Sequence, residues 1–134
     1  MAFQLSVAVR NARVNAVPAT VGASAVIKIF SGAEPADCAA ADPAGLLATV
    51  SLPATWYAAA SNGTGAMTGT WSGTASATGT AASFRVYDST GATCHMQGAC
   101  SIAGGGGDMI LTNTSLASGQ AFSVTSFNIT DGNA

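Results

Sequence analysis

His95 is the single histidine of this 134-residue chain, so a Ser-His-Asp arrangement would have to use it. Such an arrangement also needs a carboxylate to orient the imidazole, and Asp88, Asp108 and Asp131 are the candidates. However, His95 lies in a run that alternates like a strand, where it would meet solvent or a backbone carbonyl. We expect this second environment, and therefore no catalytic residue and no enzyme.

Three cysteines, Cys38, Cys94 and Cys100, could bind a metal or form a disulfide. The C-H-x4-C spacing around His95 lacks the C-x2-C knuckle that wraps a tetrahedral zinc ion, so we expect no metal and no cofactor. Cys94 and Cys100 would lie about 20 Å apart on one straight strand, beyond disulfide reach unless Gly98 turns the chain. The odd count fits a protein made in a reducing cytoplasm.

The acidic residues near the end of the first third of the chain do not form a known motif. Glu34, Asp37 and Asp42 lie in a stretch rich in Pro and Ala and lack the order of a calcium loop, so we expect solvated loop charges. The run Gly104–Gly107 is followed by neither Lys-Ser nor Lys-Thr, and it predicts a turning connection rather than a phosphate-binding loop.

Aromatic side chains could instead bind a sugar by stacking. Trp56, Tyr57 and Trp71 are the candidates for such a platform. With two Trp and two Tyr in the whole chain, packing in the core or at an interface is the simpler expectation.

Positive charge is concentrated at the N-terminal end. Residues 1–30 carry Arg10, Arg13 and Lys28 and no acid, a formal charge of +3, whereas the rest of the chain carries −5. Two interpretations remain open. Either this asymmetry is scatter among few charges, or the three cations contact an acidic partner or the acidic part of a neighbouring copy.

The overall composition excludes several classes of protein. Ala, Gly, Thr and Ser make up 74 of 134 residues, and a net charge of −2 argues against a nucleic-acid-binding surface. Gly, Ser and Thr interrupt every apolar run, so we expect no membrane span. Arg10 and Arg13 lie where a signal peptide would need its apolar segment, so none is expected.

The N-terminal segment predicts a helix over roughly residues 5–17, with Ser6 available as its cap. The apolar positions at helical spacing are Leu5, Ala8, Val9, Ala12 and Ala16. A strand is the alternative, because Phe3, Leu5, Val7 and Val9 alternate with more polar residues. Pro18 stands where either element could end.

Beyond Gly22, short alternating or β-branched runs separated by turn residues predict about seven strands. The expected strands are Ala25–Phe30, Leu46–Leu52, Ala66–Trp71, Ser83–Tyr87, Thr93–Gln97, Met109–Thr112 and Phe122–Ile129. We therefore expect a single domain over residues 1–134. In it, a helical arm over 1–22 precedes a mainly β sandwich or small barrel over 23–134.

Three local patterns refine this expectation. The run Asp88–Gly91 has the residues of a tight turn and predicts a hairpin. In Phe122–Ile129 neither face is cleanly apolar, which suits a strand that touches protein on both sides or bends midway. The stretch Gly63–Ala82 is low in complexity and nearly uncharged, so we favour packed β structure or ordered loops there over a flexible linker.

Four segments carry a resemblance to a known class of proteins: Ser6–Arg13, Ser83–Gly91, Gly105–Asn113 and the closing Asp131–Ala134. Together with the texture of most of the chain, they resemble small virion proteins of tailed bacteriophages. Such proteins are rich in Ala, Gly and Thr and mostly β, and several are decoration or cement proteins on the outside of a capsid. The resemblance implies a virion component made in the bacterial cytoplasm, and it brings no catalytic or ligand-binding residue with it.

Three functions follow as expectations. The first is a capsid decoration protein that forms a homo-oligomer, by family analogy a trimer, and binds the major capsid protein. Its helix and first strand would make the contact, with Arg10, Arg13 and Lys28 setting the orientation. The second is a structural protein of the tail, baseplate or fibre. The third is a carbohydrate-binding module.

Overall fold

The computed structural model describes residues 3–132, which form ten strands and one helix. Residues 133–134, part of the closing segment of the resemblance, lie outside the described residues. The elements are α1 (Val7–Val21), β1 (Val26–Phe30), β2 (Leu46–Ser51), β3 (Thr64–Ala66), β4 (Trp71–Thr74), β5 (Gly79–Thr80), β6 (Ser83–Tyr87), β7 (Cys94–Ser101), β8 (Met109–Leu111), β9 (Ser115–Leu116) and β10 (Ala121–Thr130). The expected class, mainly β with a short N-terminal helix, is confirmed.

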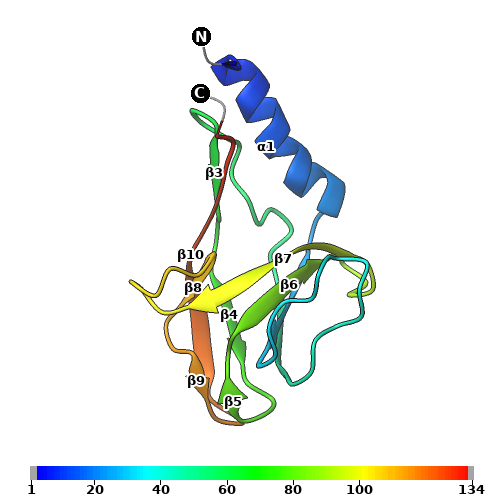
Figure 1. The fold of residues 1–134 in the computed structure, drawn as a ribbon, viewed down its shortest axis with the longest axis vertical. Helices are drawn as coiled ribbons and strands as arrows, with labels where there is room; N and C mark the ends of the chain where they lie inside the picture. The colour runs from blue at the N-terminus through cyan, green and yellow to red at the C-terminus, as the bar shows by residue number, and fades with distance from the viewer. Residues whose placement is uncertain (1–2, 133–134) are drawn as a thin grey trace.

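The strands form one curled mixed sheet in the order β2-β1-β6-β7-β8-β10-β3, and β4 also pairs with β10 (Figure 1). β7 and β8 are parallel, and the other neighbours in this sheet are antiparallel. β4 packs against β2, so the curl brings distant parts of the sheet together as a half-barrel. The short pair β5–β9 is separate.

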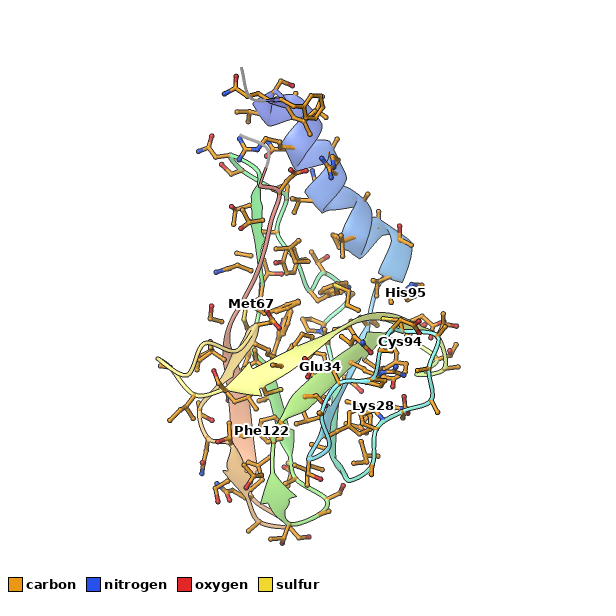
Figure 2. All side chains as sticks on the ribbon, viewed as in Figure 1. Lys28, Glu34, Met67, Cys94, His95 and Phe122 are labelled. Atoms are coloured by element: carbon orange, nitrogen blue, oxygen red, sulfur yellow. The ribbon has the colours of Figure 1, made fainter. Side chains whose placement is uncertain are left out.

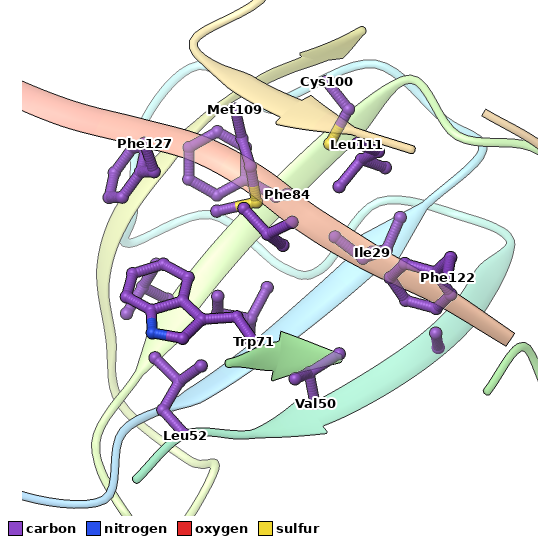
Figure 3. Close-up of a cluster of buried hydrophobic side chains, with 14 of the residues drawn as sticks. Ile29, Val50, Leu52, Trp71, Phe84, Cys100, Met109, Leu111, Phe122 and Phe127 are labelled. Carbon is purple, nitrogen blue, oxygen red and sulfur yellow. The ribbon is translucent and has the colours of Figure 1, made fainter. Parts of the chain in front are cut away.

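The inside of the curl is an apolar core (Figure 3). Its largest members are aromatic, and Phe84 and Phe127 meet edge to face with ring centroids 5.3 Å apart. Small residues let the layers approach closely. A Cβ on Gly73 of β4 would come within 2.8 Å of the Val50 side chain on β2. Glycine is therefore required where the curl closes.

A β-bulge explains the mixed pattern of the last strand. Phe122 and Val124 point into the core, and β10 then shifts register against β8 between Val124 and Ser126. Beyond the shift the inward position moves to Phe127, because one extra residue changes which side chains face inward. β10 pairs with β4 over Ala121–Val124, with β8 from Val124 to Phe127, and with β3 over Asn128–Thr130. Of the two alternatives for this strand, the register shift supports the bend midway.

α1 begins at the predicted cap but continues past the predicted end. The Ser6 side chain accepts a hydrogen bond from the Val9 N–H at 3.2 Å, as expected of an N-cap. The helix runs four residues beyond the predicted end at 17, through Pro18, to Val21. It ends where the Gly22 N–H donates to the Pro18 carbonyl. Proline removes one helical hydrogen bond, and the turn that follows it is still closed by this contact. The strand alternative is wrong. In the described part of the chain, no helix is long and apolar enough to span a bilayer.

Two other strand boundaries differ from the prediction. Residues 66–71 form parts of two strands, β3 and β4, because Gly69 has a φ of +72° and the Trp71 indole N–H donates to the Thr68 carbonyl within the intervening turn. β7 extends four residues further than predicted. By contrast, the hairpin between β6 and β7 is confirmed at Asp88–Gly91. Packed β structure in Gly63–Ala82 is also confirmed, because β3, β4 and β5 lie there.

The glycine run forms the predicted turning connection, here between parallel strands. Residues 102–108 bring the chain from the end of β7 to β8, so that Cys100 lies opposite Met109. A parallel connection is normally much longer. This short one is made possible by the positive φ values of Gly104 and Gly106. The Ser101 hydroxyl closes it by accepting from the Gly107 N–H.

Candidate functional site

His95 does not lie in a catalytic arrangement. It is half-buried on β7, at the rim of an open groove of about 280 Å³ between α1 and β7. Its side chain makes no hydrogen bond or ion pair with any described residue. The orienting carboxylate that a triad needs is therefore not in place among residues 3–132.

The cysteines do not form a metal centre in the described part of the chain, where no group of three or more metal-ligating side chains comes together. Cys94 and Cys100 lie near opposite ends of β7, which continues through Gly98, so the alternative in which Gly98 turns the chain between them is wrong. The thiol of Cys94 instead donates to the Met96 carbonyl at 3.3 Å, and burial together with the neighbouring Cys38 thiol raises the pKa of Cys94.

The aromatic residues that could have formed a sugar-stacking platform are inside the protein. Trp56, Tyr57 and Trp71 are 2 %, 6 % and 1 % exposed. The indole of Trp56 donates to the Gly22 carbonyl at 2.8 Å. Their role is packing in the core, which is the simpler of the two expectations.

A cluster of polar side chains covers the outer face of β1, β6 and β7. It consists of Lys28, Asp42, Arg85, Tyr87 and Gln97, and we call it the polar clamp. Lys28, Arg85 and Gln97 are cross-strand neighbours in adjacent strands. Asp42 comes from the loop between β1 and β2, and the clamp therefore holds this loop against the sheet.

Arg85 is the centre of the clamp and is 2 % exposed. Its Nη1 donates to the Ala40 carbonyl and to Asp42 Oδ1, both at 3.0 Å. Its Nη2 donates to the Asp37 carbonyl at 2.9 Å, and its Nε donates to Gln97 Oε1 at 3.2 Å. A buried guanidinium is stable only when its donors are satisfied in this way.

Lys28, one of the three predicted partner contacts, also belongs to the clamp. Its Nζ lies 4.5 Å above the centre of the Tyr87 ring and donates to the Gly91 carbonyl at 3.2 Å. The same Nζ is 3.8 Å from Asp42 Oδ2. Its strand, β1, is paired on both sides, and the clamp covers the face that carries Lys28. The first strand therefore offers no free edge to a partner.

The electrostatics of the clamp favour its charged form. Burial raises the pKa of the Asp42 carboxyl, but hydrogen bonds from Tyr87 and Arg85 outweigh it and hold the pKa below its usual value. Burial, together with the hydrogen bond to Asp42, raises the pKa of the Tyr87 hydroxyl. Asp42 thus stays ionised and Tyr87 stays protonated across the neutral range.

The expectation of solvated loop acids holds for Glu34 and Asp37, which are exposed loop residues, and is incomplete for Asp42, whose exposed carboxylate also pairs with a buried arginine. Asp42 is bound in the clamp, and the Asp37 carboxylate accepts hydrogen bonds from the N–H groups of Ala39 and Ala40 at 2.9 and 3.0 Å. Glu34 is exposed, as predicted. Arg85, a charged residue between Phe84 and Val86 in a predicted strand, could have indicated this cluster from the sequence. A buried arginine requires hydrogen-bond partners.

Two asparagines and a valine attach α1 to the rest of the protein. Asn11 Oδ1 accepts from the Gly63 N–H, and Asn15 Oδ1 accepts from the Ala60 N–H, both at 2.7 Å. Between them, Val14 is buried and packs directly against Gly65 of β3. Because residues 11, 14 and 15 share one helix face, that face packs against β3 and the segment before it. We call β3 and the part of β10 that pairs with it the β3–β10 arm.

The two predicted contact arginines also have partners within the chain. Arg10 Nη2 donates to the Asn62 carbonyl at 2.9 Å, and Arg13 Nε lies 3.0 Å from Asp131 Oδ2. Both bonds join α1 to the segments at the end of the β3–β10 arm. Arg13 keeps 56 % of its side chain exposed, so its contact with an acidic partner stays a prediction.

The opposite side of α1 is uncovered. It carries Val9, Ala12, Ala16 and Ala19, all exposed, and we call it the outer helix face. Their spacing of three, four and three residues places them on one stripe that points away from Val14. None of the four is charged or polar. Figure 2 shows that α1 projects from the sheet, with its outer side facing away from the β3–β10 arm.

Further apolar side chains extend beyond this stripe at the start of the helix. Phe3 is 77 % exposed and Val7 is 47 % exposed, next to Val9 of the outer helix face, which is 45 % exposed. Three of the five large hydrophobic side chains that are exposed in the described residues therefore lie at this end of the molecule. The exposed apolar groups are concentrated rather than scattered.

Comparison with known proteins does not identify a family for this chain. No family model matches the chain, and neither a curated protein nor a solved structure matches it significantly.

Proposed function

We propose that this chain is a structural protein that acts by assembly, and specifically a capsid decoration protein of a tailed bacteriophage. The observation that carries the proposal is the outer helix face. It is an apolar, uncharged surface on a helix that is firmly attached to its own domain by the opposite face. A rigid helix presented in this way is suited to pack against another protein.

The spacing on the outer helix face favours a second copy of the chain as the first partner. Val9, Ala12, Ala16 and Ala19 occupy alternating three- and four-residue intervals, which is the pattern of helices that pack side by side. Alanine lets two helix backbones approach closely. The absence of charge from these four positions means that copies would meet without repulsion along this stripe.

The area of this face limits how strong a single contact can be. A helix of 15 residues is about 22 Å long, and one face of it buries less than the roughly 800 Å² per partner of a standard stable interface. Contacts of this size become stable when a symmetric oligomer or a lattice repeats them. A shell with many identical neighbours supplies that repetition.

The virion assignment rests on the resemblance of the chain to small phage virion proteins and on its composition. Small side chains and few charges lower the cost of removing a broad surface from water. In this proposal the outer helix face joins copies of the chain into an oligomer, a trimer by analogy with the phage proteins that the chain resembles. The oligomer then binds the major capsid protein. Arg13, which is still half exposed, is the cation best placed to contribute to orientation.

The test is the copy number and position of the chain in purified particles of the phage that encodes it. Hundreds of copies per particle, in density on the outside of the head, would support the proposal. A few copies on the tail, baseplate or fibres would replace it with the second expectation, a tail structural protein. Absence from washed particles would overturn both.

A further inference from the structure

Cys38 and Cys94 form a pair that the sequence does not reveal, because 55 residues separate them. Both are free and half-buried, and the Cys38 thiol is near enough to Cys94 to help raise the pKa of the Cys94 thiol. Cys94 is at the start of β7, opposite Tyr87 of β6. Cys38 is on the loop between β1 and β2, which the polar clamp holds over these same strands.

The turn that carries Cys38 is held in place on both sides of the cysteine. Arg85 donates to the carbonyl of Asp37 before it and to the carbonyl of Ala40 after it, at 2.9 and 3.0 Å. The Asp37 carboxylate closes the turn by accepting from the backbone N–H groups of Ala39 and Ala40. Arg85 is fully buried, so this anchor is rigid.

The strand that carries Cys94 is attached to the same loop. Gln97 Nε2 donates to the Pro35 carbonyl at 2.7 Å, and the Cys94 thiol donates to the Met96 carbonyl at 3.3 Å. The bonds from Gln97 and Arg85 to the loop involve neither sulfur, so they hold the loop against β6 and β7 independently of the two cysteines. This attachment raises the effective concentration of one thiol at the other.

We propose that Cys38 and Cys94 are a disulfide-forming site, at which oxidation joins the loop between β1 and β2 covalently to β7. The oxidant is a low-molecular-weight disulfide, RSSR, of the glutathione type. Cys100 takes no part, because it lies at the far end of β7 and is buried. This inference is independent of the proposed function.

The oxidation proceeds by two exchanges. The Cys38 thiol gives its proton to solvent, and its thiolate attacks one sulfur of RSSR, which forms a mixed disulfide and releases one RS⁻. Cys94 then gives its proton to solvent and attacks the Cys38 sulfur, which releases the second RS⁻. The two RS⁻ take up the two protons, so two cysteine thiols are oxidised while one RSSR is reduced to two RSH.

The order of attack follows from the environment of Cys94. Burial and the neighbouring Cys38 thiol raise the pKa of the Cys94 thiol to about 12. The Cys94 thiolate is therefore scarce at neutral pH, so Cys94 acts second.

Cyanogen bromide gives a direct assignment, because methionines separate all three cysteines. Cleavage after Met67, Met96 and Met109 places Cys38 in fragment 2–67, Cys94 in fragment 68–96 and Cys100 in fragment 97–109. The folded full chain is equilibrated in a buffer of oxidised and reduced glutathione, its remaining thiols are blocked, and it is cleaved without reduction. We expect fragments 2–67 and 68–96 to be joined until a reductant is added. Separate fragments, or a link to 97–109, would overturn the proposal.

A second measurement keeps the proposal testable if single variants fold poorly. The glutathione equilibrium constant for forming the disulfide is compared between the native protein and the protein in urea. We expect it to be roughly a hundredfold larger in the native protein, and the oxidised form to melt several degrees higher. C100A should keep the increase in melting temperature and C38S should lose it. Equal constants in the two states would show that the fold does not place the thiols together.

Discussion

Arg85 on β6 and Asp42 on the loop between β1 and β2 are joined by an ion pair of 3.0 Å, although 42 residues lie between them. The guanidinium is 2 % exposed, while the carboxylate is 41 % exposed. One end of the pair is thus embedded in the sheet and the other faces solvent. This asymmetry makes Arg85 the anchor and the loop the attached part.

Replacing Arg85 by Leu should destabilise the protein by about 3 kcal/mol, because several charge-assisted hydrogen bonds are lost together. Urea unfolding measures the change. Hydrogen exchange provides an internal control, since amides of the loop between β1 and β2 should exchange faster while those of α1 do not. Uniform acceleration in both segments would contradict the clamp as a local anchor.

Asp42 should make stability depend on pH on the acid side. Its pKa is lowered in the folded protein, so its contribution is present above the ordinary carboxyl value of about 4 and is lost as the pH falls through the lowered value. In D42N this part of the acid dependence should disappear. Urea unfolding between pH 2 and 6, compared for the two proteins, measures it. Parallel curves for the two proteins would contradict the assignment.

Tyr57 should make stability depend on pH on the alkaline side. Burial raises the pKa of its hydroxyl to about 12, so its contribution is present below the ordinary value of about 10 and is lost as the pH rises through 12. Tyr57→Phe should cost about 1–2 kcal/mol at pH 7, because the single hydroxyl proton is donated to the Gly65 carbonyl at 2.8 Å and shared with the Phe127 carbonyl at 3.2 Å. The cost should shrink above pH 10. A cost that stays constant to pH 12 would refute this contribution.

Gly65 should be required for the attachment of α1. A Cβ at this position would press on the Tyr57 ring and on the Val14 side chain, so Gly65→Ala should cost about 2 kcal/mol. Gly132→Ala is the matched control, because nothing lies within 4 Å of the added methyl group. Thermal unfolding of both variants measures the difference. Equal melting temperatures would mean that α1 does not depend on this contact.

A charge on the outer helix face should prevent self-association. Ala16→Glu places a carboxylate in the centre of the stripe, whereas Ala103→Glu makes the same change on an exposed loop. Light scattering after size-exclusion chromatography should show oligomers for the wild type and A103E, and monomers for A16E. A wild type that is monomeric at high concentration would remove the helix from the assembly proposal.

Several elements could be predicted because their signals are local. Short alternating or β-branched runs predicted strands over Leu46–Leu52 and Ser83–Tyr87, and the structure has strands over Leu46–Ser51 and Ser83–Tyr87. The residues of Asp88–Gly91 defined a hairpin, because a tight turn needs only adjacent residues with suitable backbone preferences. The cap at Ser6 was predicted for the same reason.

Boundaries were less predictable where a local preference was overridden. Pro18 favours a helix end, but α1 continues to Val21, which is buried against the sheet. Tertiary packing of that side chain compensates for the hydrogen bond that proline removes. The bulge in β10 was visible only as a mixed pattern, because it is the pairing with β8 that shows which residue is extra.

The sequence by itself determined the class of the protein, a mainly β chain with an N-terminal helix, since backbone preferences and apolar periodicity act over a few residues. Only the tertiary structure decided that Arg85 meets Asp42, that Cys38 meets Cys94, and that one face of α1 is covered while the other is open. These contacts join residues far apart in the chain. Their proximity follows from the order of strands in the sheet, which no local pattern encodes.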